Sequence, residues 1–181
     1  MAYRVLQSET IFQGKVFGVR IDQVESPTGQ TMRVDVVEHG GAVVMIPVDD
    51  NQRIWLVRQY RHPTGKTLLE LPAGTLDPGE DPKTCAVREC REEIGMSPSY
   101  LVPLGGAFMA PGYSTEFLHF FLVGDLTPAP LTPDADEDIY VERLTWDEIM
   151  ELIARGELQD TKSLAGLFLA RDHLGKAIPP S

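Results

Sequence analysis

The sequence has few cysteines and no long hydrophobic run. Its 181 residues include only two cysteines, Cys85 and Cys90. Both fall in a predicted helix, where five residues rise about 7.5 Å and turn the two side chains apart, so a disulfide between them is excluded. Free thiols are typical of a reducing compartment, and we therefore expect a cytoplasmic protein. The longest apolar run, around residues 41–48, is too short to cross a bilayer.

Basic residues are also scarce. Lys and Arg number 16 against 27 Asp and Glu, giving a formal net charge of −11. This balance argues against a nucleic-acid partner, because the phosphate backbone would be repelled. A small phosphorylated substrate is not excluded, but it would need local arginines and a metal ion. Residues Met1–Arg4 are not followed by an apolar signal region, so we expect neither a signal peptide nor a membrane partner.

The remaining composition is that of a globular protein, with 43% hydrophobic and 24% charged residues. The length favours one domain over residues 1–181. Alternating or apolar runs predict strands, and capping residues before amphipathic segments predict helices. The strands expected are 3–12, 16–24, 31–37, 42–48, 54–60, 68–71, 100–109, 117–123 and 139–144, and the helices are 82–94, 145–154 and 161–174. Strands followed by interleaved helices indicate a mixed α/β sandwich.

The stretch from Gly74 to Met96 is the most informative part of the chain. It opens as a loop and continues as a helix capped by Asp81, with Pro82 in the first turn. On this helix Glu89 and Glu93 are four residues apart, and Glu92 follows Glu89 by three. Such carboxylates repel one another unless a cation lies among them, and oxygen ligands suit Mg²⁺ or Mn²⁺. The alternative is a solvated helix face, on which Arg88 pairs with Glu92.

The order of residues in this stretch is that of the Nudix box. The pattern is Gly, five residues, Glu, seven residues, Arg-Glu, an aliphatic residue, any residue, Glu-Glu, any residue, Gly and an aliphatic residue. Every fixed position is filled, from Gly74 to Gly95. Cys90 and Met96 occupy the aliphatic positions, and Cys90 is a mild departure. The chain therefore resembles the Nudix hydrolases, which implies a Nudix-type α/β/α sandwich with a mixed β-sheet and an N-terminal β-hairpin.

Three further signals look like the ADP-ribose pyrophosphatase branch. They are the run 58–61 (RQYR), the run 70–74 (ELPAG) and Pro111, which lies fifteen residues after Met96. The resemblance implies hydrolysis of the diphosphate linkage of ADP-ribose to AMP and ribose 5-phosphate. It also implies two or three Mg²⁺ ions per site, with Mn²⁺ as an alternative.

The same resemblance implies roles for individual residues. Glu89 and Glu93 would be the principal metal ligands, completed by Glu92 and the carbonyl of Ala73. Arg88 and Glu92 belong to the catalytic group, whereas Glu80 orients the loop. Glu137 is the expected general base, with its acidic neighbours Asp134, Asp136 and Asp138, or Glu116, as alternatives.

The resemblance also suggests which residues bind the substrate. Arg61 matches a phosphate-binding arginine. Arg58 would point to the opposite face of its strand, so it is a weaker candidate and could be an edge charge only. Glu70 would meet ribose hydroxyls or metal, or anchor the loop. Met109 and Glu116 complete the set, while core packing is expected for Phe108.

Members of this branch are homodimers whose N-terminal strands reach the partner subunit. Residues 1–40, with the hairpin 16–37, would serve dimerisation, and residues 41–181 would form the catalytic core. The same hairpin could instead cap its own sheet.

Four other functions stay open. One is a nucleotide-sugar pyrophosphatase acting on a substrate such as GDP-mannose, and another is a different Nudix substrate class. The third is a non-catalytic ADP-ribose sensor, against which the complete set of box glutamates counts. The fourth is a structural Ca²⁺-binding helix, which leaves Arg88 and the Gly74 loop unexplained.

Overall fold

The computed structural model describes residues 2–132 and 138–174. The backbone contacts divide the chain into two compact units. The first comprises the residues up to Gly41 together with Ala107–Leu118, and the second comprises Ala42–Gly106 and the residues from His119 onward. The prediction of a single domain over 1–181 stays a prediction.

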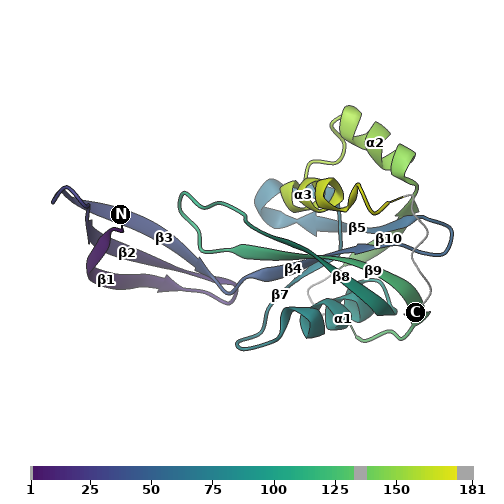
Figure 1. Cartoon of the computed structure of the whole chain (residues 1–181), viewed down its shortest axis with the longest axis horizontal. Coiled ribbons are helices and arrows are strands. Elements are labelled where there is room, and N and C mark those ends of the chain that lie inside the picture. The colour runs from purple at the N-terminus through teal and green to yellow at the C-terminus, as the bar shows by residue number, and fades with distance from the viewer. Residues whose placement is uncertain (1, 133–137, 175–181) are drawn as a thin grey trace. The chain divides into compact units, whose positions relative to one another are not determined.

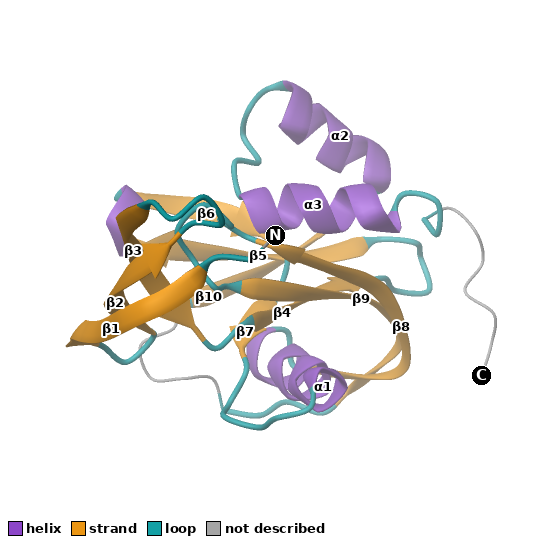
Figure 2. Cartoon of the chain, turned by 60° about the vertical axis from the view of Figure 1, so that its left-hand side comes forward, coloured by secondary structure: helices purple, strands orange, loops and turns teal. Residues whose placement is uncertain are grey.

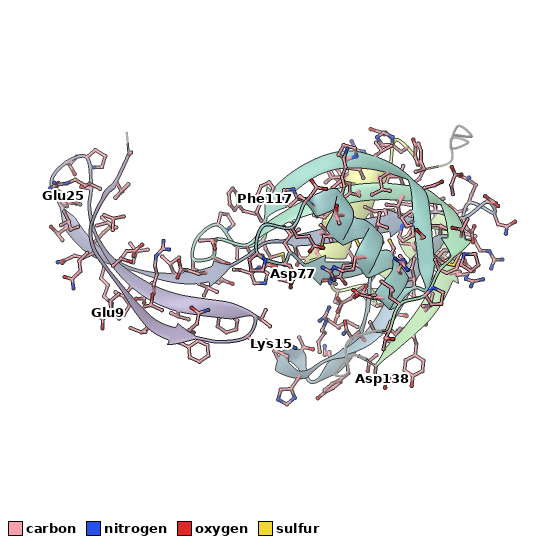
Figure 3. The ribbon with its side chains drawn as sticks, turned by 90° about the horizontal axis from the view of Figure 1, so that it is seen from below. Glu9, Lys15, Glu25, Asp77, Phe117 and Asp138 are labelled. Carbon is pink, nitrogen blue, oxygen red and sulfur yellow. The ribbon has the colours of Figure 1, made fainter. Side chains whose placement is uncertain are left out.

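The first unit is built on an antiparallel sheet of β1 (Arg4–Gln13), β2 (Phe17–Glu25) and β3 (Thr31–His39), in the order β1-β2-β3. The predicted hairpin is confirmed, because β2 and β3 pair without interruption from Phe17–His39 to Glu25–Thr31. All ten residues of β1 are exposed. Figure 3 shows the side chains around Glu9 and Glu25 projecting from both faces of this sheet.

The second unit contains two sheets. The first has the order β7-β4-β9-β8, and the second has the order β10-β5-β6. The strands are β4 (Ala42–Pro47), β5 (Ile54–Arg61), β6 (Lys66–Glu70), β7 (Ala73–Thr75), β8 (Met96–Phe108), β9 (Phe117–Pro128) and β10 (Ile139–Leu144), and a 3₁₀ turn η1 (His62–Thr64) follows β5. The ends of β8 and β9 within residues 107–118 belong to the first unit.

Helices cover both sides of the sheets in the second unit. In Figures 1 and 2, α1 (Pro82–Glu93) lies on one side of the strands, and α2 (Trp146–Ala154) and α3 (Thr161–Ala170) lie on the other. All six residues of β4 are buried, as its continuous apolar sequence requires of a strand covered on both faces. Val43 and Met45 pack in a cluster with Cys85, Ala86 and Cys90 of α1.

The other face of β4 meets α3, where a glycine permits close packing. A Cβ at Gly166 would lie 2.8 Å from Leu71 Cδ1 and 3.5 Å from Ile46 Cδ1. The helix backbone therefore approaches the sheet as closely as a glycine allows. Together these layers form an α/β/α sandwich.

Most predicted elements are confirmed, and β10 has the predicted bounds. The expectation of a loop at Gly74 is wrong, because Ala73–Thr75 form the short strand β7, paired with β4 through Val43 and Gly74. Three residues are too few to show an alternating pattern. The helix predicted to reach Leu174 ends at Ala170. In the part of the chain that the structure describes, no helix is long and apolar enough to cross a membrane.

Candidate functional site

Helix α1 is fixed at both ends by local sequence. The Asp81 carboxylate accepts hydrogen bonds from the backbone N–H groups of Lys83 (3.0 Å) and Thr84 (3.1 Å), and Pro82 occupies the first turn. Gly95 follows with φ of 71°, a left-handed conformation that favours glycine and stops the helix. Ala86 and Cys90 pack into the core, and Glu89 and Glu93 are buried beside them on the same side of the helix.

Neither cysteine is a candidate nucleophile. Cys85 and Cys90 are both free and buried, as predicted. Burial raises the pKa of the Cys85 thiol and of the Cys90 thiol, so both stay protonated.

Arg88 is the charge around which the box carboxylates gather. It holds Glu80 with two parallel bonds, Nε to Oε1 at 3.0 Å and Nη2 to Oε2 at 2.9 Å. Its Nη1 also donates to Glu89 Oε1 (2.7 Å) and to Glu92 Oε2 (2.8 Å). The pair of Arg88 with Glu92 is thus present, but it belongs to a partly buried cluster rather than to a solvated face.

The charges of this cluster shift one another's pKa values. The hydrogen bonds from Arg88 lower the pKa of Glu80 to about 2, and Glu80 in turn raises the pKa of Arg88. Glu80 also accepts a bond from the backbone N–H of Asp77, at 3.1 Å, in the loop before α1 (Figure 3). Glu80 therefore joins this loop to Arg88, in the orienting role expected for it.

Glu89 and Glu93 face strand β7. A Cβ built on Gly74 would lie 1.8 Å from Glu89 Cδ, so the carboxylate occupies space that only glycine leaves open. Glu93 Oε2 accepts a hydrogen bond from the backbone N–H of Ala73 at 2.9 Å. Glu89 is 8% exposed and Glu93 is 6% exposed. The fold thus brings the predicted metal ligands Ala73, Glu89 and Glu93 together.

These groups fit a hard divalent cation by their chemistry. They are carboxylates one helical turn apart beside a strand backbone, and so they offer oxygen donors only. Among residues 2–132 and 138–174, no three His, Cys, Asp or Glu side chains already form a metal-ligating group. In this structure Arg88 engages Glu89 and Glu92 instead.

A second charged cluster lies at the ends of β5 and β6. Arg61 donates to both carboxylate oxygens of Glu70, at 2.9 Å and 2.8 Å, and Lys162 of α3 donates to the same carboxylate. Burial raises the pKa of Glu70, but Arg61 and Lys162 outweigh that effect and lower the pKa overall. The pKa of Arg61 is raised, first by its hydrogen bond to Glu70 and further by the negative charge of Glu93. Of the glutamates of the Nudix box, Glu93 is the one that contributes to this shift.

Arg58 has a different environment from Arg61. It pairs with Glu142 of β10. The β5–β6 register is regular from Val57 to Arg61, so Arg58 and Arg61 face opposite sides, as the alternation predicted. The alternative that Arg58 is only a charge at the edge of a sheet is wrong about its position, because β5 is the central strand of the sheet β10-β5-β6.

The remaining candidates lie elsewhere in the chain. Met109 and Glu116 belong to the first unit, where the Met109 N–H donates to the Glu116 carbonyl at 3.0 Å. Phe108 was expected in the core, but it is 58% exposed, and its ring makes an edge contact with Phe117 at 5.0 Å. Glu137, Asp134 and Asp136 lie outside the described residues, so their proposed roles stay predictions.

The predicted start of α3 at Thr161 is confirmed, but sequence reasoning did not name its capping residue. Asp160 caps this helix by accepting from Ser163 N at 3.0 Å, a role that its residue type could have indicated. Lys162 contacts Glu70, which lies 92 positions earlier in the chain, and no local sequence pattern predicts this contact.

Several known proteins are similar to this chain. A family model described as NUDIX domain matches residues 38–167. The chain is 38% identical to an ADP-ribose pyrophosphatase of Mycobacterium tuberculosis over 169 residues, covering 91% of this chain and 81% of that protein. It is 35% identical to a methanol dehydrogenase activator of Bacillus methanolicus, with 88% of the relative covered and 89% of this chain.

A solved structure shows the same fold. The crystal structure of an ADP compounds hydrolase superposes with a TM-score of 0.85 and 27% identity, covering 96% of this chain and 95% of that one. This match confirms the predicted Nudix-type sandwich with a mixed sheet and N-terminal antiparallel strands. With the Nudix box complete and folded as a helix against β7, the chain belongs to the Nudix hydrolase family.

Proposed function

We propose that this protein hydrolyses the diphosphate linkage of ADP-ribose to AMP and ribose 5-phosphate with the help of divalent metal ions. The observation that carries the proposal is the assembled box, in which Arg88 holds Glu80, Glu89 and Glu92 while Glu93 lies buried against Ala73. The names of the relatives, ADP-ribose pyrophosphatase and ADP compounds hydrolase, support the substrate.

Each part of the site has a task in this reaction. Glu89, Glu93, Glu92 and the Ala73 carbonyl would hold Mg²⁺, or Mn²⁺ in its place. The bound ions would neutralise phosphate oxygens and lower the pKa of water. Arg88 keeps the carboxylates oriented, because one guanidinium bonds three of them. Arg61 binds a phosphate oxygen, and Glu137 accepts the proton of the attacking water.

The proposal extends to a cytoplasmic homodimer. Buried free thiols support a reducing compartment. On the first unit, large apolar side chains are more than 40% exposed, among them Val5, Leu6, Ile11 and Phe12. Such surfaces are typical of association sites. Light scattering after size-exclusion chromatography tests this proposal, and a monomer at micromolar concentration would contradict it.

A substrate panel with and without Mg²⁺ tests the activity. The panel contains ADP-ribose, GDP-mannose, UDP-glucose, NADH, a diadenosine polyphosphate and a deoxynucleoside triphosphate, with Glu93→Gln as the inactive control. We expect Mg²⁺-dependent AMP formation from ADP-ribose to exceed turnover of the other compounds. Faster cleavage of GDP-mannose would support the nucleotide-sugar alternative. Tight binding of ADP-ribose without turnover of any compound would support a sensor.

A further inference from the structure

Glu70 is a buried carboxylate shared by two cations that differ in exposure. Its side chain is 2% exposed, whereas the side chain of Arg61 is 39% exposed and that of Lys162 is 14% exposed. Arg61 is thus the cation that a ligand can reach, and Lys162 is the one that stays covered. Both donate to Glu70 Oε2.

Lys162 is held in place independently of Arg61. Its Nζ donates to Asp160 Oδ2 at 2.9 Å, and Asp160 also caps α3 through Ser163 N. The Ser163 hydroxyl donates to Asp160 and accepts the backbone N–H of Leu71 at 2.6 Å, beside Glu70. The start of α3 is therefore attached to the end of β6, just before the strand that carries Ala73.

This arrangement matters when Arg61 contacts a phosphate. Arg61 bonds Glu70 through Nε and Nη2, so this pair leaves the N–H donors of Nη1 for a second anion. The charge of Glu70, however, offsets that of Arg61 and thereby weakens the attraction of Arg61 for a phosphate. Lys162 is a second cation on Glu70, and by balancing this buried carboxylate it leaves more of the charge of Arg61 to act on the phosphate.

We propose that Lys162 is a positioning residue for phosphate recognition, because it balances the charge of Glu70 while Arg61 bonds both that carboxylate and the substrate. The inference rests on the proposed function, in which Arg61 binds a phosphate of a nucleoside diphosphate. It assigns to the C-terminal helix α3 a part in binding the substrate, without a contact of its own with the ligand.

The first experiment compares Lys162→Met with Lys162→Arg. We measure the Kd of ADP-ribose and of inorganic pyrophosphate by calorimetry in EDTA, and kcat and KM with Mg²⁺. Lys162→Met should weaken binding and raise KM about tenfold with kcat within about twofold, since the lost interaction is uniform in ground and transition states. Lys162→Arg should restore most of the affinity. Unchanged affinity for both ligands in Lys162→Met would overturn the proposal.

A matched control removes a lysine that does not touch Glu70. Lys66 is exposed on β6 and contacts Gln159 at 3.4 Å, so Lys66→Met deletes the same charge close to the start of α3. It should leave Kd and KM unchanged. An equal loss in both lysine variants would mean that long-range charge alone governs affinity, which contradicts the proposed role.

A double-mutant cycle with Glu70→Gln separates positioning from direct contact. In the Glu70→Gln background the buried side chain is neutral and leaves no charge to balance, so adding Lys162→Met should change Kd by less than about twofold. A full effect in that background would show that Lys162 meets the ligand itself. A fall in kcat and melting temperature without a change in Kd would show a purely structural role. Both outcomes overturn the inference.

Pyrophosphate keeps this test separate from the proposed function. If the wild-type protein does not hydrolyse ADP-ribose, the proposed function fails. The dependence of pyrophosphate binding on Lys162 then still decides whether Lys162 positions Arg61.

Discussion

The carboxylate of Glu89 lies against the Cα of Gly74, at a distance that leaves no room for a side chain. A Cβ at Gly74 would fall 1.8 Å from Glu89 Cδ and 2.0 Å from Oε1. The glycine of the Nudix box is therefore needed for space, because it allows a strand backbone and a helix carboxylate to approach each other. Strand β7 and helix α1 form one site through this contact.

Substitution of this glycine should remove the activity while leaving the fold in place. Gly74→Ala forces the Glu89 side chain away from β7, which disturbs a proposed metal ligand. We expect kcat/KM to fall at least about 100-fold, with a small change in melting temperature because the end of a flexible side chain can move. Steady-state kinetics with Mg²⁺ and thermal unfolding provide the two measurements.

The control for this prediction is a double-mutant cycle with Glu89→Ala. If Gly74→Ala acts by displacing Glu89, it should have little further effect once Glu89 is truncated. Additive losses in the double variant would mean that Gly74 serves the site by another route.

Arg88→Gln should change the pH dependence of stability. Hydrogen bonds from Arg88 lower the pKa of Glu80 from 4.5 to about 2. A carboxyl with a depressed folded-state pKa contributes stability above its unfolded pKa and loses it as the pH falls toward the folded pKa. The free energy of unfolding should therefore favour the wild type most above pH 4.5, and the difference should shrink toward pH 2. Urea unfolding at several pH values measures it.

An exposed arginine provides the comparison. Arg155 pairs with Glu157 at 2.8 Å, with both side chains more than half exposed. Arg155→Gln should show a small difference from the wild type that hardly varies with pH, since surface pairs contribute little. A pH-independent difference for Arg88→Gln as well would contradict the role assigned to Glu80.

Glu93→Gln should lower kcat more than Glu92→Gln, because the two glutamates of the Nudix box have different environments. Glu93 is buried and bonded to Ala73, whereas the Glu92 side chain is 23% exposed and bonded to Arg88. Glu93→Gln should lower kcat at least about 100-fold, while Glu92→Gln should lower it about tenfold. The amide oxygen introduced by Glu93→Gln can still accept the Ala73 bond, so stability should hardly change. The two kcat values and Mg²⁺ titrations measure this order, and full activity of Glu93→Gln would exclude Glu93 as a ligand.

The identity of the general base calls for a kinetic comparison. Glu137→Gln should lower kcat by at least about 100-fold while the Kd for ADP-ribose changes less than about threefold, because a base acts mainly in the transition state. Glu116→Gln, the alternative, should affect kcat much less. The reverse order would transfer the role of base to Glu116.

Local sequence was sufficient to predict helix α1. Its cap at Asp81, its apolar face and its glycine stop each depend on neighbours within a few residues, and all three are present in the structure. The same holds for β4, whose unbroken apolar run predicts a strand buried on both faces. Regular hairpins such as β2–β3 also follow from alternation and turn residues.

Other features depend on contacts that no local pattern encodes. Strand β7 exists because its backbone pairs with β4, from Ala42 to Val44. Phe108 was expected in the core because it is apolar, but it is exposed. Its burial depends on the elements that pack around it, and its residue type does not specify them.

The sequence by itself determined the family, the fold class and the four glutamates of the box, because a long motif with fixed spacing records a chemical requirement. Tertiary structure decided how these groups are held. Only folding brings Arg88 to Glu80, places Glu89 on Gly74, and joins Lys162 to Glu70 across 92 residues. Such contacts result from packing one element on another, and that packing depends on the whole chain at once.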